Sequence, residues 1–291
     1  MSPTACSNNV SDFHSRPSPV WLCGAYRLEF SQPAIMAIIN LTPDSFSADG
    51  LDGSVDGAKR RAEQALLDGA SILDIGGEST RPGSTAVTLQ DELARVIPVV
   101  RALSSFNVPI SVDTTKPEVM AEAIAAGASI INDINSLREP GALDVVAASN
   151  VGVCMMHMQG QPRDMQLWPN YMNVTNEVHS FLEQRIDVVV ASGVETSRIS
   201  LDPGFGFGKT LDHNLELFRA LPELCASGLP VLIGVSRKAM LGAITGQPVE
   251  DRVIATAAAS MLAAQRGVSI LRVHDVVETR DALAMWSAVE Q

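Results

Sequence analysis

Three copies of one short pattern decide the fold: Gly69-Ala-Ser-Ile-Leu-Asp74, Gly127-Ala-Ser-Ile-Ile-Asn132 and Gly267-Val-Ser-Ile-Leu-Arg272. Each copy follows an alanine-rich stretch of helical composition and begins with glycine, the residue best suited to the left-handed position that ends a helix. Each then continues into an aliphatic run that ends in a polar side chain. The pattern therefore predicts a helix that leads directly into a buried strand.

The same alternation extends along the chain. Near-continuous apolar runs are typical of parallel strands that are buried on both faces. The predicted strands are 35–40, 72–77, 109–113, 130–134, 151–157, 199–202, 231–236 and 270–275. The predicted helices between them include 54–68, 117–126, 175–192 and 250–266.

This alternation predicts an α/β fold, a closed (β/α)8 TIM barrel. The length of 291 residues suits such a barrel, which usually needs about 250. An open doubly wound sheet is the alternative, but the chain lacks the glycine fingerprint of dinucleotide-binding sheets. We expect one barrel domain over residues 21–291, after a flexible arm at 1–20 that is rich in Ser, Asn and Pro. An alternating stretch at 20–30 predicts a hairpin that closes the bottom of the barrel.

The composition of the chain limits the classes of molecule that the protein is expected to bind. The net charge of -12 disfavours nucleic acid and anionic membrane surfaces, so a local group of cations would mark a site for an anion. No apolar run has the length of a membrane span, and the N-terminus lacks an export signal. Cys6, Cys23, Cys154 and Cys225 form no CxxC pair. We therefore expect a soluble cytoplasmic protein.

Polar residues follow the first two predicted strands, at the end where barrel enzymes hold their active sites. The first strand leads into Asn40-Leu-Thr-Pro-Asp-Ser-Phe-Ser47, in which 42–45 alone would be an ordinary turn. The second leads into Asp74-Ile-Gly-Gly-Glu-Ser-Thr-Arg-Pro-Gly83. Its two glycines permit close approach of a ligand, and the side chains at 79–81 supply donors for an anion.

The third and fourth strands end in Ser111-Val-Asp-Thr-Thr-Lys-Pro117 and Ile131-Asn-Asp-Ile134. Asp113 and Thr114 have two interpretations, as ligands or as caps of the helix that begins at 117. Asn132 lies within an apolar run, so its amide needs polar partners that a ligand could supply. Polar residues at the ends of two neighbouring strands, both facing the open end of the barrel, are more than helix capping requires.

The fifth and sixth strands lead into Met155-Met-His-Met-Gln-Gly160 and Leu201-Asp-Pro-Gly-Phe-Gly-Phe-Gly-Lys209. A lone histidine such as His157 is as often structural as functional, and the methionines either pack the core or contact a flat aromatic ligand. The glycine-rich stretch lacks the spacing of a Walker loop, so it does not predict a nucleotide site.

Cations follow the last two strands, in Gly234-Val-Ser-Arg-Lys238 and Leu271-Arg-Val-His-Asp275. A buried cation is costly without a counter-charge, so Lys238 should face carboxylates or an anionic ligand. Arg272 and His274 are two residues apart on a strand and share a face, which predicts an anion clamp.

The polar strand ends therefore form two groups. One group of carboxylates and an amide suits the donor edge of a nitrogen heterocycle, and the other group of cations suits a diphosphate. No Ser–His–Asp or metal-ligand spacing competes with this interpretation. The first group is Asp113, Asn132 and Asp202, and the second is Arg81, Arg272 and His274.

These motifs, in this order between residues 35 and 275, resemble those of the dihydropteroate synthase family of folate biosynthesis, the target of sulfonamides. The resemblance implies a transferase that condenses (7,8-dihydropterin-6-yl)methyl diphosphate with 4-aminobenzoate and releases diphosphate. It also implies a Mg²⁺ cofactor and a homodimer. One departure is the first loop, where Ser45-Phe-Ser-Ala-Asp-Gly50 stands in place of the usual Ser-Phe-Ser-Asp-Gly-Gly.

The resemblance also implies residue roles. The pterin would contact Asp113, Asn132, Met156, Asp202, Phe207 and Lys238. The diphosphate would contact Asn40, Arg81, Arg272 and His274, and Asn40 would also bind Mg²⁺. The 4-aminobenzoate would contact Phe46, Thr80, Arg81, Pro82, Ser236 and Lys238. The catalytic residues would be Asp113, Asp202, Lys238, Arg272 and His274.

The implied reaction fits an S_N1-like route in which diphosphate leaves before the arylamine attacks, with Asp113 and Asp202 stabilising the positive charge on the pterin. Two alternatives stay open at this point: a pterin-dependent methyltransferase barrel and a paralogue that only binds pterins. The Ser-Arg-Lys and Arg-Val-His strand ends argue against the methyltransferase, because methyltetrahydrofolate carries no diphosphate.

Overall fold

The strands of the computed structural model lie close to their predicted positions. The structure describes residues 18–41, 54–79, 83–84 and 86–290, and within these ranges two strands form a hairpin and eight form a parallel sheet. The hairpin strands are β1 (Val20–Cys23) and β2 (Tyr26–Glu29). The sheet strands are β3 (Ala34–Asn40), β4 (Ile72–Gly76), β5 (Ile110–Asp113), β6 (Ile130–Asp133), β7 (Gly152–Met156), β8 (Ile199–Asp202), β9 (Leu232–Ile233) and β10 (Ile270–Val273).

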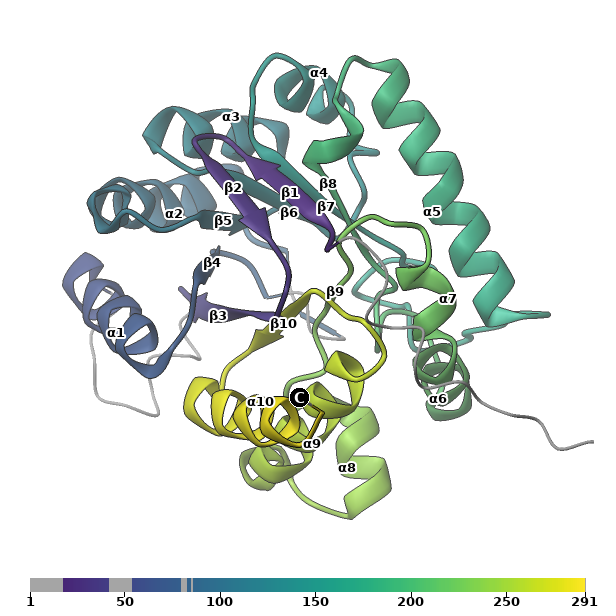
Figure 1. Cartoon of the computed structure of the whole chain (residues 1–291). Helices are drawn as coiled ribbons and strands as arrows, with labels where there is room; N and C mark the ends of the chain where they lie inside the picture. Colours follow the sequence, from purple (N-terminus) through teal and green to yellow (C-terminus); the bar gives the residue numbers. More distant parts are fainter. Residues whose placement is uncertain (1–17, 42–53, 80–82, 85, 291) are drawn as a thin grey trace, which may run out of the picture.

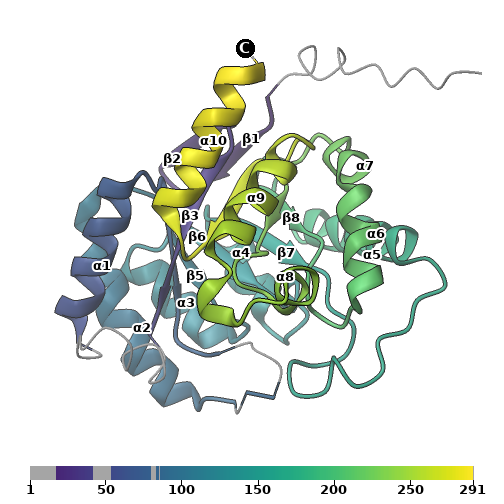
Figure 2. The same cartoon turned by 90° about the horizontal axis from the view of Figure 1, so that it is seen from below.

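The sheet closes into a barrel with helices outside it (Figures 1 and 2). Its strand order is β8-β7-β6-β5-β4-β3-β10-β9, and a parallel bridge between Leu201 and Val231 joins the two outer strands. The prediction of a (β/α)8 TIM barrel is confirmed. The α-helices are α1 (Val55–Asp68), α2 (Leu89–Leu103), α3 (Pro117–Ala126), α4 (Ala142–Ala147), α5 (Val174–Ala191), α6 (Leu211–Arg219), α7 (Leu221–Cys225), α8 (Ala239–Thr245), α9 (Val253–Ala264) and α10 (Val276–Glu290). The 3₁₀ helices are η3 (Ser104–Phe106), η4 (Thr196–Arg198) and η5 (Val249–Asp251).

The glycines that begin the repeated pattern have the predicted backbone conformation. The φ angles of Gly69, Gly127 and Gly267 are 113°, 114° and 92°. Gly69 and Gly127 directly follow α1 and α3, and their N–H groups donate to the last turn of each helix. Since an L side chain is strained at such angles, glycine makes the abrupt change from helix to strand possible.

The hairpin lies across the amino ends of the barrel strands, as predicted (Figure 1). Trp21 and Cys23 are fully buried in an apolar cluster with Met36, Ile72 and Ile130, which point into the barrel from β3, β4 and β6. The indole N–H of Trp21 donates to the carbonyl of Arg198 at 2.9 Å. We call this cluster the floor. Residues 1–17 of the predicted arm lie outside the described residues, and β1 begins at Val20.

Two predicted elements differ most from the structure. The strand predicted over 231–236 extends only over Leu232–Ile233, with Val231 bridged to Leu201. Beyond it the chain turns through Arg237, whose φ is 56° and whose N–H donates to Thr256. The helix predicted over 250–266 divides into η5 and α9, and Arg252 stands between them with its guanidinium bound to the carbonyls of Gln247 and Arg237. Among the described helices, none has the length and apolar character needed to cross a membrane.

Candidate active site

A cavity of about 840 Å³ lies at the carboxyl ends of the strands, opposite the floor. We call this end the mouth. The predicted site residues that line the cavity are Asn40, Asp113, Phe207, Ser236, Lys238, Arg272 and His274. Three more, Asn132, Met156 and Asp202, are buried side chains of the neighbouring strands β6, β7 and β8.

Arg272 joins two carboxylates at the centre of the mouth. Its Nε donates to Asp74 Oδ2 at 2.6 Å, and its Nη2 donates to Asp113 Oδ2 at 2.8 Å. Asp74 is fully buried and Asp113 is 9% exposed, so both need a counter-charge. The three side chains come from β10, β4 and β5 and meet inside the barrel. Arg272 therefore holds the acidic group together besides facing the cavity.

The register of the sheet places the other polar residues beside this group. Asp113 on β5 is the partner of Asn132 on β6, and Met156 on β7 is the partner of Asp202 on β8. Asn132 Nδ2 lies 3.5 Å from Asp74 Oδ1. Because residues at one level of a closed barrel face the same interior, side chains from distant parts of the chain form one polar layer.

Burial shifts the pKa values of these charged groups. It raises the pKa of the Asp113 carboxyl, and Arg272 opposes that rise. It also raises the pKa of Asp202, and Lys238 opposes that rise. Burial works against the charge on Arg272, but the nearby carboxylates outweigh it and raise the pKa of the guanidinium. Arg272 therefore stays charged, whereas the carboxylates are sensitive to what enters the cavity.

Lys238 faces carboxylates, as its position predicted. Burial lowers its pKa to about 8, and Asp202 is the strongest opposing influence. Its Nζ donates to the carbonyl of Phe205 and lies 4.4 Å from the centroid of the Phe207 ring. Asp202 Oδ1 accepts from the N–H of Gly204 at 2.7 Å, so the loop after β8 holds both members of this pair of charges.

An apolar wall stands next to Lys238. Met156 is buried with Ile134, Met158 and Met165, and the ring of Phe207 packs against this cluster. The neighbouring Met155 belongs instead to the main core between strands and helices. Met155 therefore packs the core, as one interpretation predicted, and contact of Met156 with a flat aromatic ligand stays a prediction for which the wall offers a polarizable surface.

The ends of β3, β9 and β10 form the other side of the cavity. His274 Nδ1 lies 3.0 Å from the hydroxyl of Ser236, which also accepts from the backbone N–H of His274 at 3.1 Å. Asn40 ends β3, and the guanidinium of Arg61 on α1 donates to its carbonyl at 3.3 Å. The side of the cavity formed by β3 and β10 is therefore rich in hydrogen-bond donors.

The capping interpretation of Asp113 and Thr114 is wrong. The residue that precedes α3 is Lys116, and no side chain caps the helix. The hydroxyl of Thr114 donates to Glu92 at 2.6 Å, and the ammonium of Lys116 binds Glu92 and Glu78. Asp113 forms an ion pair with Arg272 instead. This charged group joins α2 to the loop after β4, which carries the side chains at 79–81.

Four of the predicted site residues lie outside the described residues: Phe46, Thr80, Arg81 and Pro82. In the described ranges, no group of three or more His, Cys, Asp and Glu side chains is placed to hold a metal ion. The amide oxygen of Asn40 is the side-chain ligand that the family resemblance implies for Mg²⁺. One neutral oxygen fits a Mg²⁺ ion that takes its other ligands from waters and substrate phosphates.

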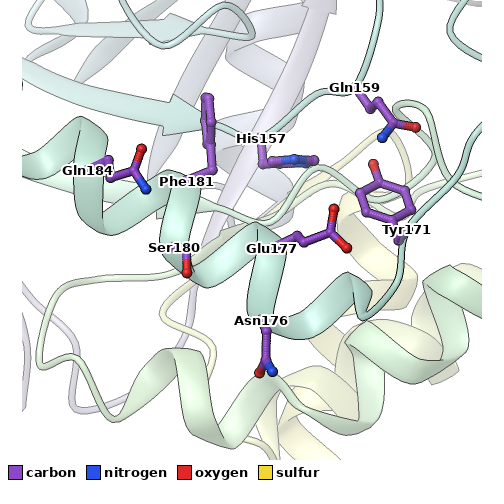
Figure 3. Close-up of a pocket in the computed structure, with 8 residues that line it drawn as sticks. All are labelled: His157, Gln159, Tyr171, Asn176, Glu177, Ser180, Phe181 and Gln184. Atoms are coloured by element: carbon purple, nitrogen blue, oxygen red, sulfur yellow. The ribbon is translucent and has the colours of Figure 1, made fainter.

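His157 does not line this cavity; it lines a second pocket of about 380 Å³ against α5 (Figure 3). Its ring is packed between Phe181 and Tyr171, and its Nδ1 lies 3.0 Å from the buried ammonium of Lys209. Sequence reasoning left His157 undecided and gave Lys209 no role. It also missed Asp74, although an acidic residue inside a fully buried strand was the available signal.

Known proteins share both the sequence and this geometry. The pattern of the pterin binding enzyme family matches residues 36–274. The dihydropteroate synthase of Haemophilus influenzae is 48% identical over 262 residues, which cover 90% of this chain and 95% of that protein. The chain belongs to the dihydropteroate synthase family. Its activity is therefore that of a transferase of folate biosynthesis.

Solved structures of the dihydropteroate synthase family superpose closely on this chain. The Yersinia pestis enzyme, solved in complex with a sulfonamide drug, has a TM-score of 0.90 with 46% identity and covers 93% of this chain and 99% of its own. The Burkholderia cenocepacia enzyme, complexed with 7,8-dihydropteroate, has a TM-score of 0.86 with 48% identity and covers 94% and 97%. Both the fold and the resemblance given by the motifs are confirmed.

Proposed function

We propose that the mouth condenses (7,8-dihydropterin-6-yl)methyl diphosphate with 4-aminobenzoate, forming 7,8-dihydropteroate and diphosphate. The observation that carries this proposal is the charged group Asp74–Arg272–Asp113, with Asp202 and Lys238 beside it, at the mouth of a barrel of this family. The product in the Burkholderia cenocepacia complex has the same chemical identity.

The pterin would lie between the polar layer and the apolar wall. Asp113, Asp202 and Asn132 supply acceptors for the N–H groups of the ring, and Lys238 supplies a donor. Phe207 and Met156 would contact the ring faces. Burial raises the pKa values of the two carboxylates, so their negative charge is costly, and the N–H donors of a pterin would reduce that cost.

The diphosphate would lie on the side formed by β3 and β10. The two carboxylate contacts of Arg272 use two of the five N–H donors of its guanidinium, so donors remain for a phosphate. His274 and Asn40 flank it, and the resemblance adds Arg81. Mg²⁺, held by Asn40 and the phosphates, would neutralise the negative charge of the leaving group.

Ionisation of the C–O bond to diphosphate is the step that this arrangement favours. Arg272 and His274 stabilise the departing anion, while the carboxylates of Asp113 and Asp202 stabilise the cation that spreads over the pterin ring. The arylamine nitrogen is a free nucleophile, so its positioning suffices. Ser236 and Lys238, together with Phe46, Thr80, Arg81 and Pro82 from the resemblance, would form the 4-aminobenzoate sub-site.

Diphosphate release measured with and without 4-aminobenzoate separates this proposal from its alternatives. We expect release that depends on 4-aminobenzoate and on Mg²⁺, with one dihydropteroate formed per diphosphate. A protein that only binds pterins would release none. A methyltransferase would transfer the methyl group of methyltetrahydrofolate and leave the diphosphate ester intact. Absence of release at every Mg²⁺ concentration overturns the proposal.

We further propose that the protein is a homodimer. The supporting observation is that α9 and α10, which lie side by side (Figure 2), both expose large apolar side chains. Ile254 is 83% exposed, Met285 66% and Val289 76%. Contact with a second copy would remove such side chains from water. Light scattering of the wild type and of Ile254→Asp tests this: a dimer that becomes a monomer is expected, and a monomeric wild type contradicts it.

We also propose a cytoplasmic location. Its support is that the thiols of Cys23 and Cys154 are buried and free, which is typical of proteins of reducing compartments. Fractionation of cells that express the full chain tests it, and recovery outside the cytoplasmic fraction contradicts it.

A further inference from the structure

Lys209 is a buried lysine that the proposed reaction does not use. Only 3% of it is exposed, and its Nζ lies 2.8 Å from the carbonyl oxygen of Gly204, 3.1 Å from that of Phe207 and 3.0 Å from His157 Nδ1. These three shorter contacts match the three donors of an ammonium group, and the carbonyl oxygen of His157 lies 3.4 Å from the same nitrogen. A buried charge is retained at a considerable cost, so a complete set of partners indicates a specific role for the group.

The contacts of Lys209 join two loops at the mouth. Gly204 and Phe207 belong to the loop after β8, whereas His157 directly follows β7. The two loops are in close contact: a Cβ atom on Gly204, whose φ is 71°, would lie 1.9 Å from the carbonyl oxygen of His157, and one on Gly208 would lie 2.3 Å from that of Gln159. In this close packing the carbonyl groups of both loops lie near the ammonium of Lys209, which donates hydrogen bonds to them.

His157 is held in place from its other side. In Figure 3 its ring lies between Phe181 and Tyr171, and the Phe181 ring meets it edge-on at 5.0 Å. The Tyr171 hydroxyl donates to the carbonyl of Gly208 at 2.8 Å, which adds a second link to the loop after β8. Burial and the charge of Lys209 lower the pKa of His157 to about 3. The imidazole is therefore neutral, and its Nδ1 accepts a hydrogen bond from the ammonium.

The loop that Lys209 holds is the same loop that positions the pterin sub-site. The N–H of Gly204 donates to Asp202, and the carbonyl of Phe205 accepts from Lys238. The Phe207 ring lies against Lys238 and the methionine wall. Lys209 thus fixes the backbone on either side of Phe205, whose carbonyl and neighbours set the position of the charged pair Asp202 and Lys238.

We propose that Lys209, held by His157, is a positioning residue for the pterin sub-site. It ties the loop 204–208 to the end of β7 and so fixes Phe207 and Lys238 against the pterin ring. The inference rests on the proposed function. Among the described residues, the hydrogen bonds of Lys209 go to His157, Gly204 and Phe207, and none reaches the diphosphate side of the cavity on β3 and β10. Binding of the two halves of the substrate should therefore respond differently to its loss.

The test is the variant Lys209→Met, which keeps the length of the side chain and removes its donors. We expect the Kd for 6-hydroxymethyl-7,8-dihydropterin, measured by calorimetry, to rise about tenfold or more, as for loss of a charge-assisted hydrogen bond. The KM for the pterin substrate should rise similarly, while the Kd for inorganic diphosphate stays within about twofold. Lys59→Met, which removes an exposed charge on α1, is the matched control and should change neither constant.

A pair of His157 variants keeps the proposal testable if Lys209→Met does not fold. His157→Leu removes the acceptor and should weaken pterin binding, whereas His157→Asn retains an acceptor near the position of Nδ1 and should restore most of it. Unchanged pterin binding in His157→Leu, or equal losses for pterin and diphosphate, would overturn the proposal. Failure of the proposed function is seen separately, as a wild-type protein that makes no dihydropteroate.

Discussion

The floor and the mouth are built on the same strands, yet they differ in almost every physical respect. Met36, Ile72 and Ile130 point into the barrel near the amino ends and meet Trp21 in a dry apolar cluster. Near the carboxyl ends, Asp74 and Asp113 meet Arg272. Ile72 and Asp74 are only two residues apart on β4, yet the side chain of Ile72 lies in the apolar cluster whereas that of Asp74 forms an ion pair. The floor contributes stability, and the mouth contributes binding and catalysis.

The first way to break this comparison is to truncate the floor. Trp21→Ala should lower the free energy of unfolding by about 3–5 kcal/mol, because a large buried ring is replaced by a cavity. Chemical denaturation measures this. Trp168→Ala, which removes an 89% exposed indole, is the matched control and should stay within about 0.5 kcal/mol of the wild type. At 25 °C the folded Trp21→Ala protein should keep its KM values; a changed KM would show that the floor shapes the site.

At the mouth, the largest loss is expected for Arg272→Ala. Both Asp74 and Asp113 lose their counter-charge, and the departing diphosphate loses a donor, so kcat should fall by about 10²–10³. Steady-state kinetics measures this. Arg272→Lys keeps the charge but cannot bridge two carboxylates as the planar guanidinium does, so it should recover only part of the loss. A raised KM with unchanged kcat would contradict the role of Arg272 in diphosphate departure.

Lys238→Ala should produce a smaller effect of a different kind. It removes a donor to the pterin and a neighbour of Asp202, so the KM for the pterin substrate should rise about tenfold, with a lesser change in kcat. The Kd for inorganic diphosphate, measured in parallel, serves as the internal comparison, because Lys238 has no assigned contact with the diphosphate. Loss of turnover without any change in pterin affinity would assign Lys238 to the chemical step instead.

The smallest expected effect is on how the free energy of unfolding depends on pH, through the buried side chain of His157. In the folded protein the pKa of His157 is about 3, against 6.5 for an ordinary histidine. Between these values the unfolded chain binds a proton that the folded protein does not, so the stability contributed by neutral His157 is lost as pH falls. His157→Asn should therefore lose less stability than the wild type between pH 6.5 and 4.5. Denaturation at several pH values measures the difference.

The same comparison controls for the other charges around His157. Lys209 and Arg138 both face it. Burial lowers the pKa of Lys209 to about 7, so its ammonium becomes more fully protonated as the pH falls through this range. Carboxylates whose pKa values burial raises, such as Asp133, titrate in both proteins and cancel in the difference. Parallel acid profiles for the two proteins would show that His157 is not the buried neutral base described above.

Local patterns account for most of what the sequence predicted. The strand at 199–202, the helix at 117–126 and the left-handed glycines Gly69 and Gly127 follow from apolar runs and helix termini, which depend on neighbouring residues. The short β9 was not predicted: the chain beyond it turns at Arg237, whose N–H donates to Thr256 on a helix that follows later. Local composition does not contain that information.

The site divides in the same way. The sequence predicted which residues lie at strand ends, and the family motifs indicated which substrates bind there. The ion pairs could not be predicted from the sequence: Arg272 binds carboxylates that lie 198 and 159 residues away along the chain. Their partnership depends on barrel closure and strand register. Likewise, the burial of Lys209 depends on how tightly the loop 204–208 packs on the end of β7.

A crystal structure of the protein with 7,8-dihydropteroate tests the central claim most directly, namely that the mouth is the pterin site. The pterin ring is expected between the side chains of Asp113, Asn132, Asp202 and Lys238, with Phe207 along the ring. Binding of the pterin in the pocket beside His157 and Tyr171, or outside the barrel mouth, would contradict the account.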